Sequence, residues 1–166
     1  MQRLAGQMQF QEIVGVDVSS RTLDIAQERL RRGRFFDNPD RLKLLLGSLT
    51  YRDRRLAGYD AAACVEVIEH LDPPRLQAFE RVLFSATRPK TVVLTTPNAE
   101  YNVKFAGMAQ GKFRHRDHRF EWTRPEFRTW AEGVASRNAY RVALSGLGDD
   151  DPLVGCPTQM AVFTLV

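Results

Sequence analysis

The chain has 166 residues, of which 43% are hydrophobic and 27% charged, the composition of a single globular domain. Two cysteines are too few for the disulfide framework of a secreted protein, and no apolar run approaches the roughly 20 residues that cross a membrane. The net charge of +4 permits a nucleic-acid partner without requiring one. We therefore expect a protein of the reducing cytoplasm that has no membrane association.

Short apolar runs alternate with amphipathic stretches along the chain, a pattern that predicts an α/β fold. A helix is expected after the first strand, capped by Ser19 or Ser20, and another opens at Pro73. A third helix begins at the capping box from Thr123 to Glu126. The last two strands are expected to pair in antiparallel fashion. The predicted strands cover residues 12–18, 42–46, 60–65, 91–95, 141–145 and 160–166.

Residues 98–122 form a long polar segment with weak periodicity, and such loops are usually functional or mobile. Arginines alternate with histidines and aromatic residues at its end and just beyond it, which suits phosphate contact and base stacking. A solvated, charged loop is the alternative interpretation of the same composition. The basic residues concerned are Arg114, Arg116, Arg119 and Arg124.

All three histidines of the chain fall beside acidic residues, in two short segments. Glu66, Glu69 and His70 follow a predicted strand, where open α/β sheets bind ligands. His115 and His118 lie in the long loop. Carboxylates and imidazoles together favour Mn²⁺, Fe²⁺, Co²⁺ or Mg²⁺ over a thiolate-bound zinc. The spacing leaves open a second interpretation, a salt-bridged or capping cluster without a metal.

Nucleotide chemistry has one weak signal in the strand–helix pattern. Asp17 ends the first strand, where an acid accepts hydrogen bonds from ribose hydroxyls in nucleotide-binding folds. A helix cap is the alternative role for this residue. The sequence contains no phosphate-binding P-loop, no nucleophile elbow and no pair of cysteines two residues apart.

Three segments together resemble the Hen1 small-RNA 3′-terminal 2′-O-methyltransferases, and most closely the bacterial members. They are residues 65–71 (VEVIEHL), 95–102 (TTPNAEYN) and 114–124 (RHRDHRFEWTR). The resemblance runs in order from about Val14 to the C-terminus. It implies a class I, Rossmann-like methyltransferase fold, in which a mostly parallel sheet carries an antiparallel C-terminal strand.

The resemblance also implies roles for individual positions. The implied metal ligands, which are also catalytic, are Glu66, Glu69, His70 and His118. Asp17 corresponds to the acid that binds the ribose of the cofactor, and Ser48 to a residue near its adenine. His115 is a further catalytic candidate, as a proton acceptor or end-binding residue, although a hydrogen-bonded loop histidine is an equal alternative. The candidate RNA-binding residues are Arg114, Arg116, Arg124, Asn98, Tyr101 and Asn102.

One part of the family's pattern is absent from the sequence. Class I methyltransferases begin with a strand and a glycine-rich Asp-x-Gly-x-Gly loop, whereas residues 1–11 here resemble the end of the helix that follows that loop. We therefore expect residues 1–166 to be a single, N-terminally truncated methyltransferase domain. Its first strand is expected to be missing, which leaves a gap in the middle of the sheet.

The resemblance implies methyl transfer from S-adenosylmethionine to the 2′-hydroxyl of an RNA 3′ end, with a divalent metal such as Mn²⁺ or Mg²⁺. Bacterial relatives serve RNA repair beside an end-healing and ligating enzyme, whereas eukaryotic relatives protect small regulatory RNAs. We expect the first role. Two alternatives stay open: another class I methyltransferase that acts on a small diol, and a non-catalytic fragment that binds metal or RNA ends.

Overall fold

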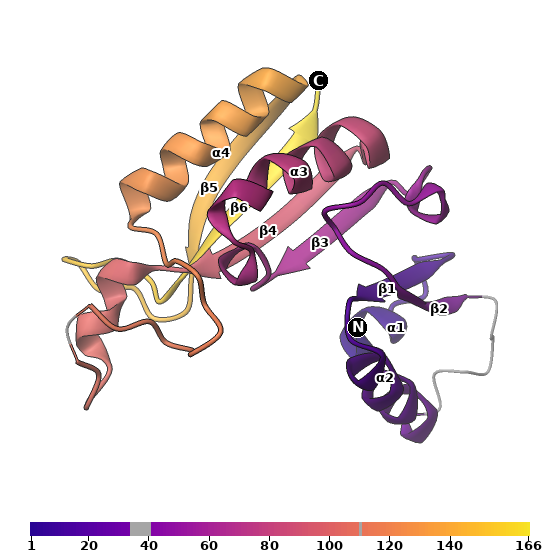
Figure 1. The fold of residues 1–166 in the computed structure, drawn as a ribbon, viewed down its shortest axis with the longest axis horizontal. Helices are drawn as coiled ribbons and strands as arrows, with labels where there is room; N and C mark the ends of the chain where they lie inside the picture. The colour runs from indigo at the N-terminus through magenta and orange to yellow at the C-terminus, as the bar shows by residue number, and fades with distance from the viewer. Residues whose placement is uncertain (34–40, 110) are drawn as a thin grey trace. The chain divides into compact units, whose positions relative to one another are not determined.

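The computed structural model describes residues 1–33, 41–109 and 111–166, which form two compact units. Residues 1–51 make up the first unit (Figure 1). Its strands β1 and β2 are parallel, and Ile13 is paired with Leu42 at the start of the register. The elements of this unit are α1 (Gln2–Ala5), β1 (Ile13–Asp17), α2 (Ser20–Arg32) and β2 (Leu42–Leu46).

Helix α2 begins and ends where the sequence predicts. The Ser19 side chain accepts a hydrogen bond from the Thr22 backbone N–H at 3.2 Å, and Gly33 follows the last turn. Leu30 packs with Ala5 and Leu42 in the small core of this unit, where each is at most 3% exposed. Burial of such side chains is what holds a short parallel strand pair and its helix together.

Residues 52–166 make up the second unit, in which one four-stranded sheet has the order β3-β4-β6-β5. Strand β3 is parallel to β4, and β6 is antiparallel to both β4 and β5. Figure 1 shows α3 and α4 along this sheet. The elements are β3 (Ala61–Val65), α3 (Leu76–Glu80), β4 (Thr91–Pro97), α4 (Arg124–Asn138), β5 (Tyr140–Leu147) and β6 (Thr158–Leu165).

The core of the second unit is aromatic. Phe79, Phe84 and Phe163 are fully buried. The ring of Phe84 meets that of Phe163 edge-on at 4.8 Å and that of Tyr140 at 5.4 Å. This contact fixes the segment after α3 against β5 and β6, because aromatic pairs add to the free energy gained by burial.

The helix predicted from Pro73 is divided into three parts. A 3₁₀ turn (Pro73–Arg75) leads into α3, and a π-helical segment (Arg81–Thr87) follows it. The two prolines open the turn, as expected, since they lack the N–H that the first turn leaves unpaired. The spacing of apolar residues indicates one continuous helix, because a π-helical turn is not visible in the hydrophobic pattern.

The sheet of the predicted fold occurs as two separate ladders. Among the described residues, β1 pairs only with β2, and β3 pairs only with β4. That residues 1–166 form one methyltransferase domain with a gap in the middle of its sheet stays a prediction.

Replacement of Thr123 by alanine tests the start of α4. The Thr123 hydroxyl oxygen accepts the Glu126 backbone N–H, and the Glu126 carboxylate accepts the Thr123 backbone N–H at 2.8 Å. These two hydrogen bonds confirm the predicted capping box. We expect Thr123→Ala to lower the free energy of unfolding by about 1 kcal/mol, as measured by urea denaturation. Unchanged stability would show that the cap is energetically neutral here.

Candidate metal and cofactor sites

A sharp turn after β3 positions two of the predicted metal ligands. The chain leaves Val65 and adopts a left-handed backbone at Glu66, with φ of 52°. A 3₁₀ turn, Ile68–His70, follows, and the side chain of Ile68 is fully buried. Because buried Ile68 anchors the turn in the core, the backbone positions of Glu69 and His70 in that turn are fixed.

The Glu69 carboxylate is fully buried and only half satisfied. Its Oε2 accepts a hydrogen bond from the Thr96 hydroxyl at 3.0 Å. Its Oε1 is the sole buried side-chain nitrogen or oxygen in the described part of the chain that has no hydrogen-bond partner. Burial, together with the nearby Glu66 carboxylate, raises the pKa of Glu69 to about 7. An unpaired buried oxygen of this kind costs free energy unless something else binds it.

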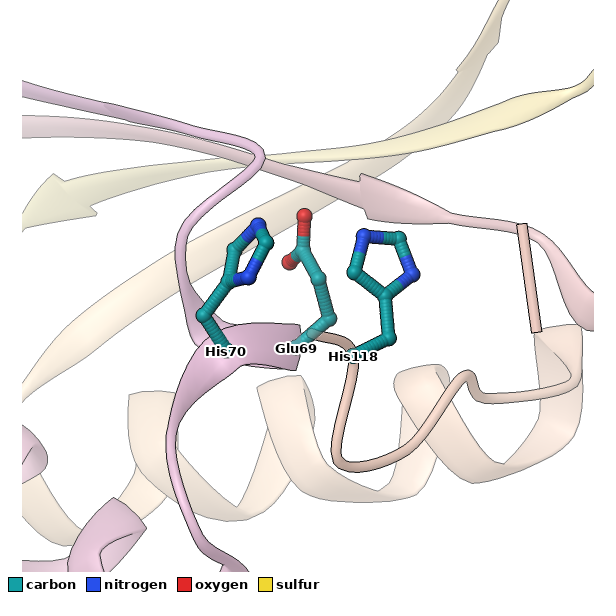
Figure 2. A group of neighbouring side chains, drawn as sticks. All are labelled: Glu69, His70 and His118. Atoms are coloured by element: carbon teal, nitrogen blue, oxygen red, sulfur yellow. The ribbon is translucent and has the colours of Figure 1, made fainter. Parts of the chain in front are cut away.

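His70 and His118 lie on either side of this carboxylate (Figure 2). Potential ligand atoms of Glu69, His70 and His118 all lie within 4.8 Å of one another. The long loop is tied to the turn by the Arg119 backbone N–H, which donates to the Glu69 carbonyl at 2.7 Å. Three residues from two segments about 50 residues apart thus meet at one point.

This donor set fits a divalent cation. It offers one unpaired carboxylate oxygen and two imidazoles, ligands that first-row divalent ions accept. Burial and the neighbouring His118 both lower the pKa of His70, which favours the neutral imidazole that a metal requires.

Glu66 and His115, also predicted at this site, lie beside the cluster. The Glu66 carboxylate accepts a hydrogen bond from the Thr95 hydroxyl at 3.0 Å, and it is not in the group of converging ligand atoms. The ring of His115 lies 6.1 Å from that of His70 and 5.7 Å from that of His118. Its Nδ1 accepts from the Asp117 backbone N–H, which favours the hydrogen-bonded loop role while leaving the ring exposed.

Glu121 belongs to the site, although the sequence did not predict a role for it. Its Oε1 lies 2.6 Å from His118 Nδ1, and its side chain is fully buried. The other oxygen, Oε2, accepts from the Asn102 amide at 2.5 Å. A carboxylate three residues after a candidate histidine ligand is a signal that could have identified it.

Most of the predicted RNA-binding residues have partners inside the protein. Asn98 is 1% exposed and its amide donates to the carbonyls of Val154 and Cys156. Arg114 is half-buried, and it donates to Asn102 Oδ1 at 2.7 Å and to the Asn98 carbonyl at 2.5 Å.

Asn102, as the partner of Glu121 and Arg114, is likewise engaged within the protein, and the other three predicted RNA-binding residues differ in exposure. Arg124 is paired with Glu100 and also donates to the Leu153 carbonyl. The Arg116 side chain is 89% exposed. The partly buried Tyr101 ring lies edge-on to Phe105 at 5.7 Å. Arg116 is therefore the predicted arginine with the most freedom to contact a phosphate.

The two predicted cofactor residues lie at the same edge of the first unit. Asp17 ends β1, and its carboxylate accepts from the Ser19 backbone N–H at 2.8 Å. Ser48 follows β2 and bonds to Thr50. Since β1 and β2 are parallel, both residues lie at carboxyl ends of strands, where nucleotides bind in α/β folds.

Comparison with solved structures defines the class of fold. Magnesium protoporphyrin IX methyltransferase from Synechocystis, solved with bound SAH, is 14% identical to this chain and has a TM-score of 0.62. The match covers 93% of this chain and 64% of the Synechocystis chain. The chain therefore has the class I methyltransferase fold, as the sequence predicts. No family model matches the chain.

More similar proteins identify the family. The methyltransferase domain of bacterial CtHen1 is 49% identical, with a TM-score of 0.87 over 99% of this chain and 83% of that domain. The small RNA 2′-O-methyltransferase of Mus musculus is 41% identical over 163 residues, which is 93% of this chain and 40% of the mouse protein. The chain belongs to the Hen1 family of small RNA 2′-O-methyltransferases. It spans about two fifths of the length of that curated relative.

In the described residues, no helix has both the length and the apolar content that crossing a bilayer requires. Both cysteines are unpaired, Cys64 in the core and Cys156 partly exposed. Burial raises the pKa of the Cys64 thiol to about 12, so this cysteine is an inert core residue, as its apolar sequence context predicts.

Proposed function

We propose that this chain transfers a methyl group from S-adenosylmethionine to the 2′-hydroxyl of the 3′-terminal nucleotide of an RNA, with a divalent metal. The observation that carries the proposal is the unpaired, buried Glu69 oxygen beside two imidazoles. Membership of a family named for small RNA 2′-O-methylation supports the reaction and the substrate. The class I fold supports S-adenosylmethionine as the donor.

Glu69, His70 and His118 are the residues that would hold the metal. Glu66 is the fourth ligand that the family resemblance implies. Its carboxylate is close enough to Glu69 to raise the pKa of that residue. When bound, a divalent ion of this type lowers the pKa of a ribose hydroxyl and fixes its orientation. A ribose hydroxyl is otherwise a poor nucleophile at neutral pH.

Other residues of the chain would bind and orient the two substrates. The exposed Arg116 would contact the RNA backbone, and the Tyr101 ring would offer a surface beside the terminal nucleotide. His115, with an exposed ring next to the cluster, would contact the RNA end, because its Nδ1 is already bonded to the Asp117 backbone N–H. Asp17 and Ser48 would hold the ribose and the adenine of the cofactor.

The RNA that we propose as substrate is a repaired 3′ end, and the partner is an RNA end-healing and ligating enzyme. Support comes from the motifs, which resemble the bacterial members, and from identity of 49% to bacterial CtHen1 against 41% to the mouse relative. The unpaired cysteines agree with a cytoplasmic location.

The reaction is tested by methyl transfer from labelled S-adenosylmethionine to a short RNA in the presence of Mn²⁺. The matched control is the same RNA ending in a 2′-deoxynucleotide. We expect label on the first RNA only, because the control lacks the nucleophile. Label on both RNAs would contradict the proposed position of methylation.

Label on neither RNA would contradict catalysis by this chain, and two further measurements then separate the alternatives. Binding of Mn²⁺ and RNA without S-adenosylmethionine would identify a non-catalytic fragment. Methylation of a free diol, but not of RNA, would identify a methyltransferase for small molecules.

A further inference from the structure

The histidine ligand supplied by the long loop is held by a buried chain of polar side chains. His118 Nδ1 lies 2.6 Å from Glu121 Oε1, and the same oxygen accepts the Arg114 backbone N–H at 2.7 Å. Asn102 donates to Glu121 Oε2 at 2.5 Å and accepts from Arg114 Nε at 2.7 Å. Every polar atom of the Glu121 carboxylate is therefore occupied within the protein.

This arrangement determines which nitrogen of His118 is available. A carboxylate accepts hydrogen bonds, so Nδ1 carries the proton and Nε2 keeps its lone pair. Figure 2 shows one ring nitrogen of His118 on the side of Glu69 and the other turned away from it. Since Nδ1 is the nitrogen bonded to Glu121, Nε2 is the one that faces the cluster.

Arg114 has a structural place in the same chain of contacts. Its guanidinium is half-buried, donates to Asn102 and to the Asn98 carbonyl, and has its Cζ 5.0 Å from the centroid of the Phe105 ring. Burial lowers its pKa, and the carboxylates of Glu121, Glu66 and Glu69 oppose that change. The arginine thus places a positive charge among three carboxylates.

We propose that Glu121 is the positioning residue of the metal site, and that Asn102 and Arg114 hold Glu121 in place. Glu121 fixes the tautomer and the ring orientation of His118 before any metal binds. Carboxylates that accept from a ligating histidine commonly contribute 10- to 100-fold, roughly, to metal affinity. This inference rests on the proposed metal site and assigns Arg114 to the protein interior rather than to an RNA phosphate.

The test is the affinity for Mn²⁺ alone, measured by electron paramagnetic resonance without RNA or cofactor. In Glu121→Gln the new amide NH2 meets a donor in either orientation: the Asn102 amide at the Oε2 position, or the Arg114 backbone N–H and His118 at the Oε1 position. Asn102 cannot turn to relieve the first clash, because its oxygen is bonded to Arg114. We expect the dissociation constant for Mn²⁺ to rise about 10- to 100-fold. Glu132→Gln, which changes an exposed carboxylate in α4, is the matched control and leaves the affinity unchanged.

A second substitution reverses the mismatch. In the double variant Asn102→Asp, Glu121→Gln, the introduced carboxylate accepts from both Arg114 and the introduced amide, so every hydrogen bond of the chain is restored. We expect it to recover most of the lost Mn²⁺ affinity. The ¹⁵N resonances of the imidazoles provide an independent readout: His118 should be protonated at Nδ1 in the metal-free wild type and in the double variant.

Each result has a distinct meaning. Mn²⁺ affinity equal to wild type in Glu121→Gln, or no recovery in the double variant, would overturn the positioning role. If Glu121→Gln does not fold, Asn102→Ala takes its place, because it keeps both charged groups while it removes the hydrogen bond to Glu121 Oε2 and the acceptor of Arg114 Nε. Unchanged affinity in that variant would also overturn the inference. Failure of the wild-type chain to bind Mn²⁺ would instead contradict the proposed metal site.

Discussion

Replacement of Glu69 by glutamine is expected to abolish Mn²⁺ binding while it stabilises the metal-free protein. The glutamine amide keeps an oxygen that accepts from the Thr96 hydroxyl, but it removes the negative charge of the carboxylate whose Oε1 has no partner. Because burial raises the pKa of Glu69 from 4.5 to about 7, its ionisation costs folding free energy as the pH rises through that range. This destabilisation by the ionised Glu69 is absent below the unfolded-state pKa and is fully present above about pH 7.

The measurement is urea denaturation of metal-free protein at pH 5 and pH 8. We expect Glu69→Gln to gain about 2 kcal/mol over wild type at pH 8, and much less at pH 5. The exposed Glu132→Gln is the control, with no such dependence on pH. A loss of stability at pH 8 would mean that the Glu69 carboxylate has a structural partner, and it would contradict the metal site.

Replacement of His118 by alanine is expected to abolish metal-dependent methylation in any active form of the protein. The substitution removes one of three converging ligands and also leaves the buried Glu121 carboxylate without its imidazole partner. Loss of a ligand from such a site lowers metal affinity by orders of magnitude, because the remaining donors no longer offset desolvation of the ion. Methyl transfer at limiting Mn²⁺ is the readout.

His118→Asn separates the loss of a ligand from a loss of folding. Its amide can donate to Glu121 from a position near that of Nδ1, but it has no counterpart of Nε2. We expect this variant to retain the thermal stability of the wild type and to lose activity as the alanine variant does. Wild-type activity in either variant at limiting Mn²⁺ would contradict the assignment of His118 as a ligand.

Local patterns in the sequence are enough to predict most of the fold. Residues that cap helices, such as Ser19 and Thr123, act on backbone groups within a few positions, so the chain itself displays them. Strands alternate with amphipathic segments at recognisable spacing, and β1 to β6 follow that pattern. The family motifs likewise identify the candidate ligands Glu69, His70 and His118, which the structure brings together.

Only the tertiary structure determined what each candidate side chain contacts. Asn98 bonds to carbonyls 56 and 58 residues away, and Arg114 to the distant Asn102, so neither partnership is visible in local spacing. The Glu66 carboxylate bonds to the Thr95 hydroxyl and lies outside the converging group, a contact that the sequence does not display. Burial of Glu69 without a second partner depends on how the turn after β3 meets β4 and the long loop. Motifs specify residue types, whereas burial and pairing are properties of the packed chain.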